Sequence, residues 1–302
     1  MRNRKNTVSE LDKLFQEVGR YRNSKEYDEL LKFVARFRNI APFNAMLIQM
    51  QKPGSKYVAS VKDWAERFQR KPKPGARPLV ILRPFGPVQF VYELNDTEGK
   101  TLPEEILNPF KAHGEISLSE LEKFIKCLFF HGIEVYNNDY GTDFYGNVEA
   151  VNKTGQYTKS RVIYKFRIPF AITINKNHDF TTQLTSTYHE LGHIYCGHLY
   201  TPDIEYLPER YNLPLEISEF EAESVCWLIC ERQGIKNPSA EYLSRYLNDN
   251  KTIPSISIDT VLKAVTSIEE IISHNITTPR KELLLKHDQN TDLYAFHQIT
   301  LS

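Results

Sequence analysis

The sequence has few cysteines, no long apolar run and no excess of charge of either sign. Four cysteines in 302 residues are too few for a disulfide framework, so we expect reduced side chains that pack in the core. No stretch approaches the roughly 20 apolar residues of a membrane-spanning helix. The charged N-terminus also lacks the apolar segment of a signal peptide. We therefore expect a cytoplasmic protein with no membrane partner.

Positive and negative charges balance over the whole chain. Lys and Arg together number 38, and so do Asp and Glu. This balance excludes a general attraction to nucleic acid or to an anionic membrane, and such a partner would need a local cluster of cations. The hydrophobic (41%) and charged (25%) fractions are typical of a globular protein, and the length suits about two domains.

The N-terminal third combines helical patterns with two β-rich segments. Apolar residues at three- and four-residue steps predict amphipathic helix within residues 8–37. Pro42 is expected to open a short helix over 42–51 that Pro53-Gly54 ends, and a further helix is expected over 61–68. The β-rich segments 78–84 and 87–94 predict a hairpin. We therefore expect an N-terminal helix-plus-β-hairpin module.

The remainder predicts a small sheet with flanking helices. Ser117 and Glu120 form a capping box, which indicates a helix that begins there. The β-rich segment 161–175 is expected to break at Pro169, because proline cannot donate a ladder hydrogen bond. Long helices resume at Asp179. We therefore expect an α+β protein.

The polar, proline-containing stretch 101–114 is the predicted boundary between two domains. We expect the N-terminal module over residues 1–112, a second domain over 113–275 and a C-terminal tail over 276–302. The tail is expected either to be mobile or to cross the N-terminal module.

The segment HELGH, from His189 to His193, carries the strongest chemical signal. Two histidines at i and i+4 share one helix face and can bind a single Zn²⁺, while Glu190 between them can act as general base. Apolar residues form a stripe on another face of the same helix, so the core does not occupy the histidine face. The alternative is a chance match on an ordinary helix. The β-rich segment before this helix, which ends at Asn175, is expected to be the edge strand that holds a peptide.

A catalytic zinc site needs a third protein ligand, and the acidic stretch after Pro214 supplies candidates. Ser218 and Glu221 are expected to form a second capping box that starts a helix. Glu219 and Glu223 then share a face, with Glu219 as the third ligand and Glu223 as the acceptor of a histidine N–H. The alternative is that both carboxylates are merely solvated. Glu216 is the reserve ligand.

The two motifs together resemble the ImmA/IrrE family of metallopeptidases, whose members pair HExxH with a downstream E-x-x-A-N/D pattern. The resemblance covers about residues 115–235. It implies a gluzincin-like metallopeptidase domain in which His189, His193 and Glu219 bind zinc and Glu190 is the general base. Family members are implicated in cleaving DNA-binding repressors, so the resemblance suggests a protein substrate of that kind. At position 223 the family often has Asn or Asp where this chain has Glu.

The N-terminal module resembles that of ArdC-type antirestriction proteins, through NAML from Asn44 and VKDW from Val61. In that group a single-stranded-DNA-binding domain precedes a related metallopeptidase domain. Trp64, Phe68 and Phe85 interleave here with cations, a combination that suits single strands. The candidate nucleic-acid-binding cations are Lys62, Arg67, Arg70, Lys71, Lys73 and Arg77. The alternative is a solvated basic turn over an aromatic core.

Other potential ligands are assigned to packing. Cys196, Cys226 and Cys230 have apolar neighbours typical of core thiols. His198 lies about 140° round the helix from His193, which favours a capping role over ligation. No spacing requires a role for His178.

The sequence therefore predicts a zinc-dependent metallo-endopeptidase that hydrolyses a peptide bond in a protein substrate. The resemblance suggests a transcriptional repressor as this substrate, in stress response, phage or mobile-element biology. The alternative is a single-stranded-DNA-binding antirestriction-type protein whose metal site is not its main activity.

Overall fold

The computed structural model describes most of the chain between residues 23 and 285. The described ranges are 23–37, 40–83, 88–102, 117–139, 145–159, 161–201, 203–235, 252–274 and 278–285, with the single positions 243, 246, 247, 249, 250 and 276. The predicted helix before residue 23, the predicted boundary near 112, Phe85 and most of the predicted tail lie outside the described residues. The described part is a mixed α+β structure, as expected.

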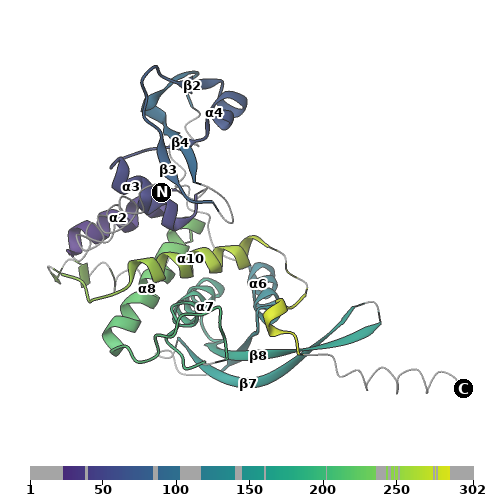
Figure 1. Cartoon of the computed structure of the whole chain (residues 1–302). Helices are drawn as coiled ribbons and strands as arrows, with labels where there is room; N and C mark the ends of the chain where they lie inside the picture. Colours follow the sequence, from purple (N-terminus) through teal and green to yellow (C-terminus); the bar gives the residue numbers. More distant parts are fainter. Residues whose placement is uncertain are drawn as a thin grey trace, which may run out of the picture.

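The N-terminal module contains helices and small antiparallel sheets, shown in purple and blue in Figure 1. Asn23 caps the first helix by accepting from Lys25 N. The predicted hairpin is present, and the three-stranded sheet has the order β1-β4-β3, while β2 pairs with β5. The elements are α2 (Ser24–Arg36), α3 (Pro42–Gln51), β1 (Val58–Ala59), α4 (Val61–Phe68), β2 (Arg70–Pro72), β3 (Leu79–Ile81), β4 (Gln89–Glu93), η2 (Leu94–Asp96) and β5 (Thr97–Gly99).

The second part of the chain builds a sheet of the order β6-β8-β7. Helices α6 and α7 lie over this sheet, with α8 and α10 beyond them (Figure 1). The Ser117 capping box at the start of α6 is confirmed. The elements are α6 (Leu118–Phe130), β6 (Ile133–Asn138), β7 (Gly146–Lys159), β8 (Val162–Asn175), α7 (Phe180–Tyr195), α8 (Leu215–Gln233), α10 (Ile258–Ser273) and η3 (Lys281–Leu283).

The predicted break at Pro169 is wrong, because β8 runs through this proline without interruption. Strand β7 has a register shift between Ala150 and Lys153, directly opposite Pro169. On the other side, the pairing with β6 begins only at Phe170. Pro169 therefore stands where the ladder needs no donor, which is where proline is tolerated in a sheet.

Strand β8 is also not the predicted edge strand. It lies in the centre of its sheet, parallel to β6 and antiparallel to β7. Local β propensity cannot distinguish a central strand from an edge strand, because position in the sheet depends on pairing with distant segments. Strands β6 and β7 form the two edges.

Helix α8 begins at Leu215, earlier than expected, and its N-cap is Pro214 without a side-chain capping bond. The predicted capping box of Ser218 and Glu221 is therefore wrong. The Ser218 hydroxyl instead donates to Leu215 O at 2.9 Å inside the helix. The Glu221 side chain therefore does not cap the helix, and it pairs instead with residues far away in the sequence.

One hydrophobic core joins α2 and α3 to α6, α7, α8, α10 and the β6-β8-β7 sheet. Buried Arg232 of α8 bridges three of these elements. Its guanidinium donates to Val34 O and Phe37 O, at 2.9 and 2.8 Å, and pairs with Glu269 of α10 at 2.7 Å.

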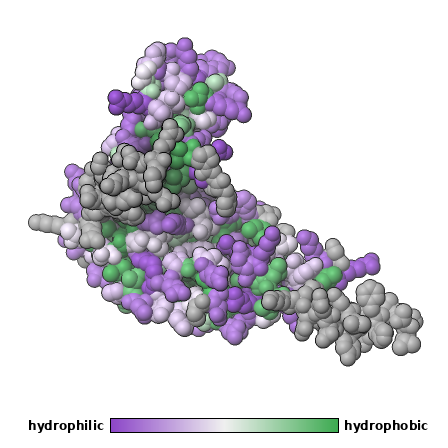
Figure 2. Space-filling view, viewed as in Figure 1, coloured by the Kyte–Doolittle hydropathy of each residue, from purple (hydrophilic) through white to green (hydrophobic). Residues whose placement is uncertain are grey.

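A separate small cluster around Trp64 fills the N-terminal sheet region. Hydrophilic side chains dominate the visible face, with small hydrophobic patches between them (Figure 2).

The described end of the chain packs on β8. Leu283 is fully buried, Leu284 forms an isolated bridge with Phe166, and Leu285 N donates to Lys165 O at 3.0 Å. This part of the predicted tail neither is free nor crosses the N-terminal module. Among the described residues, none of the helices combines the length and the apolar character that a bilayer crossing requires.

His131 supplies a test of the core around α6. It is 6% exposed, and neither ring nitrogen has a hydrogen-bond partner among the described residues. Burial, together with the charge of Arg280, lowers the pKa of His131 from 6.5 to about 4. Below pH 6.5 the unfolded chain therefore binds a proton that the folded chain does not, and the free energy of unfolding falls with falling pH.

We expect His131 to account for about 2 kcal/mol of lost stability at pH 5 relative to pH 7. His131→Phe removes the titrating group, so the decrease in the free energy of unfolding between pH 7 and pH 5 should be smaller by that amount. Urea unfolding of both proteins at the two pH values measures the difference. An equal decrease in the free energy of unfolding of both proteins would show that His131 is protonated as easily in the folded state as in the unfolded state.

Candidate metal centre

Helix α7 presents two different faces, as its sequence predicts. Leu184, Tyr188, Leu191 and Tyr195 are buried in the core. The side chains of His189 and His193 remain 24% and 13% exposed on another face. Asp179 caps the helix by accepting from Thr182 N at 2.8 Å. The histidines are thus carried by a rigid element that is anchored on its opposite side.

The structure brings His189, His193 and Glu219 together. The Nε2 atoms of the two histidines are 3.2 Å apart. The Glu219 carboxylate lies 3.4 Å from His189 Nε2 and 3.5 Å from His193 Nε2. Two ligand atoms that share a tetrahedral Zn²⁺ at about 2.1 Å lie about 3.4 Å apart, so the donor set fits zinc in spacing and in chemistry. This group is therefore a candidate metal site.

Glu190 lies between the two histidines and is 7% exposed. Burial raises its pKa to about 7, with the Glu219 charge adding to the rise and His189 opposing it. Gly146, the first residue of β7, lies against it, because a Cβ on Gly146 would come 3.3 Å from Glu190 Oε1. The sequence pattern did not single out Gly146, since only the tertiary packing places it here.

Glu223 lies where the shared helix face predicts. Its Oε2 is 3.2 Å from His189 Nδ1. A proton on Nδ1 donates to this carboxylate and leaves the Nε2 lone pair directed at the candidate metal position. Glu223 therefore orients His189, although the family pattern has a shorter side chain at this position.

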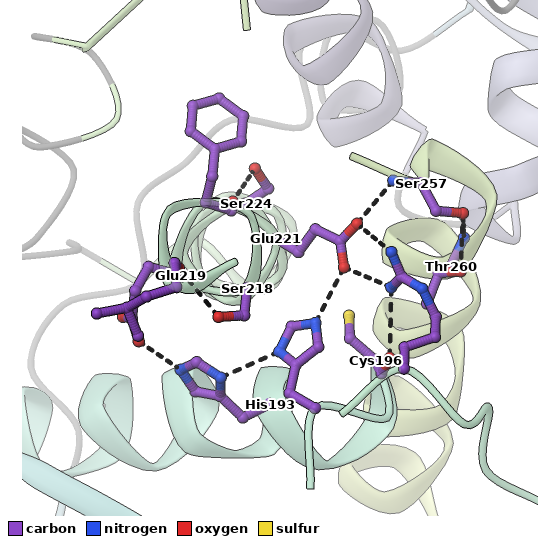
Figure 3. A network of polar contacts seen from close by, with 12 residues as sticks. His193, Cys196, Ser218, Glu219, Glu221, Ser224, Ser257 and Thr260 are labelled. Carbon is purple, nitrogen blue, oxygen red and sulfur yellow. Dashed lines mark hydrogen bonds and ion pairs between the residues drawn. The ribbon is translucent and has the colours of Figure 1, made fainter. Parts of the chain in front are cut away.

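His193 is oriented by a chain of contacts that the sequence analysis missed (Figure 3). His193 Nδ1 lies 3.0 Å from His198 Nδ1, and His198 Nε2 lies 3.0 Å from Glu221 Oε2. The Glu221 carboxylate accepts from His198 Nε2–H, and in that tautomer His198 Nδ1 accepts from His193 Nδ1–H. The Nε2 atom of His193 is then free for a metal.

Glu221 is fully buried and fully paired. The Arg210 guanidinium donates to both of its carboxylate oxygens, and Ser257 N donates to Oε1 at 2.6 Å. Such paired, hydrogen-bonded charges are the form in which proteins tolerate buried carboxylates. Despite burial, which alone would raise it, the pKa of Glu221 is lowered by His198, Arg210 and Ser257.

Cys196, His198 and Glu221 form a second group of potential ligands. Arg210 already supplies the positive charge at this place, because it holds both oxygens of Glu221. Burial also raises the pKa of the Cys196 thiol, which disfavours the thiolate that metals bind. We therefore assign this group to support of His193.

The remaining candidates lie outside the donor set. Cys226 is buried and its thiol donates to Thr185 O at 3.3 Å. Glu216, the reserve ligand, accepts from the Tyr246 hydroxyl at 3.2 Å. The His178 ring stacks on Tyr145, with ring centroids 4.8 Å apart.

Helices α7 and α8 approach closely at Gly192. A Cβ on this glycine would lie 2.9 Å from Ala222 Cα and 3.0 Å from Ala222 O. Any larger residue at position 192 must push α8 away. Because Glu219 and Glu223 are on α8, this contact sets their distance from the histidines.

Two of the three aromatic side chains considered for base stacking are not exposed, and the third, Phe85, lies outside the described residues. Trp64 and Phe68 are buried in the small core cluster, so their predicted role as stacking platforms is wrong. Arg70 is engaged with Thr97 and with the backbone of β5. Lys71 pairs with Glu98 at 3.4 Å.

Four other cations of the segment are exposed. Lys73 donates to Asn95 O at 2.9 Å, and the Arg67 guanidinium lies 5.2 Å from the Phe68 ring centroid. Lys62 and Arg77 are exposed as well. The described residues therefore fit a solvated basic turn over an aromatic core better than a stacking groove.

Comparison with protein-family models finds no match, and comparison with curated proteins finds none either. Among solved structures, the chain is similar to the Mn(II)-bound crystal structure of the antirestriction ArdC protein from the R388 plasmid. The alignment covers 77% of this chain and 83% of that chain, with 15% sequence identity and a TM-score of 0.34. A similarity of this size does not establish a common fold or activity, and membership in the ImmA/IrrE family stays a prediction.

The contact at Gly192 yields a test of the metal centre. Gly to Ala in a helix interior ordinarily stabilises a protein by about 1 kcal/mol. Here Gly192→Ala should displace α8, lower the free energy of unfolding and reduce zinc affinity by about 10- to 100-fold. Zinc titration against a competing chelator measures the affinity. Ser218→Ala, which adds no volume at the helix contact, is the control; equal affinities in the two variants would contradict the assigned role of the contact.

Proposed function

We propose that the chain is a zinc-dependent metallo-endopeptidase that hydrolyses a peptide bond in a protein substrate. The observation that carries the proposal is the convergence of His189 Nε2, His193 Nε2 and the Glu219 carboxylate on one point. Three protein ligands leave a fourth position of a tetrahedral ion open, as in catalytic zinc sites, whereas structural sites use four.

When bound there, zinc would act as a Lewis acid that polarises the scissile carbonyl and acidifies a water. His189, His193 and Glu219 would hold the ion, with Glu223 and His198 fixing the histidine tautomers. Glu190 would accept the proton of the attacking water and pass it to the leaving amine. A pKa near 7 suits a group that both takes and gives a proton at neutral pH.

The sheet supplies a place for an extended substrate. Strand β7 is an edge of its sheet and begins at Gly146, beside Glu190. An edge strand offers backbone groups to a peptide that adds to the sheet. We therefore propose that the substrate lies along the start of β7, which takes the role first expected for β8.

The proposed substrate is a protein, and the ImmA/IrrE resemblance suggests a DNA-binding repressor. The alternative function, single-stranded-DNA binding through the basic N-terminal segment, has less support because Trp64 and Phe68 are buried. A protein that only binds DNA would also have no use for a buried Glu190 beside the two histidines. The two functions respond differently to one substitution.

Glu190→Gln should keep the metal and lose peptidase activity, because the amide preserves shape but cannot accept the proton. Loss of a general base costs about 10²- to 10⁴-fold in rate. Cleavage of a proteome-derived peptide library, followed by mass spectrometry, measures activity beside zinc content. The control is Glu209→Gln, an exposed site outside the centre. Cleavage by the Glu190→Gln protein at the wild-type rate would exclude the mechanism.

A further inference from the structure

The β7–β8 ribbon extends from the sheet beyond the body of the molecule (Figure 1). Residues 150–167 contain no Asp or Glu. Their cations are Lys153, which pairs with Glu134 of β6 at 3.3 Å, and Lys159, Arg161, Lys165 and Arg167. In a chain of zero net charge, this is a strongly polarised element.

The register of the ribbon separates two different faces. On one face Phe166 lies opposite Gly155 and packs edge-on against Phe129, with centroids 5.3 Å apart. Tyr157 and Tyr164 belong to the same face and stack on each other at 5.0 Å. This face is occupied by the protein's own aromatic side chains.

The other face is polar and basic. Its cross-strand pairs are Thr154–Arg167, Gln156–Lys165 and Thr158–Ile163. All of these side chains are exposed except that of Arg167, which is partly buried and donates to Asp203 O. The face therefore presents short hydrogen-bonding groups beside cations, without a carboxylate.

Arg161, in the connection between the strands, has a left-handed backbone with φ of 67°. Residues with a Cβ rarely adopt this conformation, and glycine is the residue that it favours. Tight hairpin turns need a positive φ, so the position of Arg161 between the paired residues Lys159 and Val162 accounts for its conformation. The side chain of Arg161 adds an exposed positive charge at this end of the ribbon.

We propose that this ribbon binds double-stranded DNA, with its polar face directed into the major groove and its cations on the phosphates. The major groove admits a two-stranded β-ribbon. Single strands need free aromatic platforms, and Tyr157 and Tyr164 stack on each other on the opposite face. Membrane surfaces need an apolar face to insert, and this face has one large apolar side chain, Ile163. The binding is independent of the proposed peptidase activity.

The test removes three charges whose side chains are exposed and make no contact described for this structure: Lys159→Gln, Arg161→Gly and Lys165→Gln together. Glycine at position 161 also relieves the backbone, so the ribbon should stay folded. Fluorescence anisotropy of a labelled DNA duplex, from about 50 to 200 mM salt, measures the affinity. We expect the slope of log affinity against log salt to fall by about 3, with at least about tenfold weaker binding at low salt.

A matched control removes the same charge elsewhere, with Lys25→Gln, Lys123→Gln and Lys126→Gln, and should bind the duplex as the wild type does. If the control variant binds the duplex as weakly as the ribbon variant does, the loss of net charge alone explains the weaker binding, and the proposal is overturned. So would a wild type that fails to bind duplex at low salt. Tighter binding to a single strand, or binding to phosphatidylserine vesicles in place of the duplex, would assign the surface to another partner. Zinc content should be the same in all three proteins, which separates this test from that of the metal centre.

Discussion

The candidate metal centre depends on one close contact, between Gly192 of α7 and Ala222 of α8. Because glycine has no side chain, the two helices approach until Glu219 and Glu223 reach the histidines on the neighbouring helix. The hydrophobic side of α7 packs on the core, and Arg232 fixes α8 to α2 and α10. The fold thus holds two helices at a fixed distance and leaves the histidine face open.

Buried polar pairing determines what the centre can do. Around His193, the chain His198–Glu221–Arg210 pairs both ring nitrogens of His198 and both carboxylate oxygens of Glu221, so these atoms of the second group of potential ligands are already engaged. Around His189, Glu223 has the corresponding role. In each histidine Nδ1 is therefore engaged with the protein while Nε2 faces the candidate metal position, and the pKa of Glu190 lies near neutrality.

Local periodicity explains what could be predicted. The face shared by His189 and His193, and that shared by Glu219 and Glu223, follow from helix geometry alone. The Ser218–Glu221 capping box failed because α8 begins earlier, at Leu215, which places both residues inside the helix. Glu221 pairs instead with Arg210 and Ser257, contacts that local spacing cannot show. The central position of β8, the accommodation of Pro169 and the burial of Trp64 depend on pairing between distant segments. Those errors share one cause, long-range packing.

The most direct test is the zinc content of the purified protein, measured by elemental analysis beside Glu219→Ala and Glu216→Ala. Both variants remove a carboxylate from α8, but only Glu219 belongs to the donor group among the described residues. We predict about one zinc per chain in the wild type and in Glu216→Ala, and loss of zinc in Glu219→Ala. A wild type that neither contains zinc nor takes it up, or a Glu219→Ala protein that keeps it, would contradict the account.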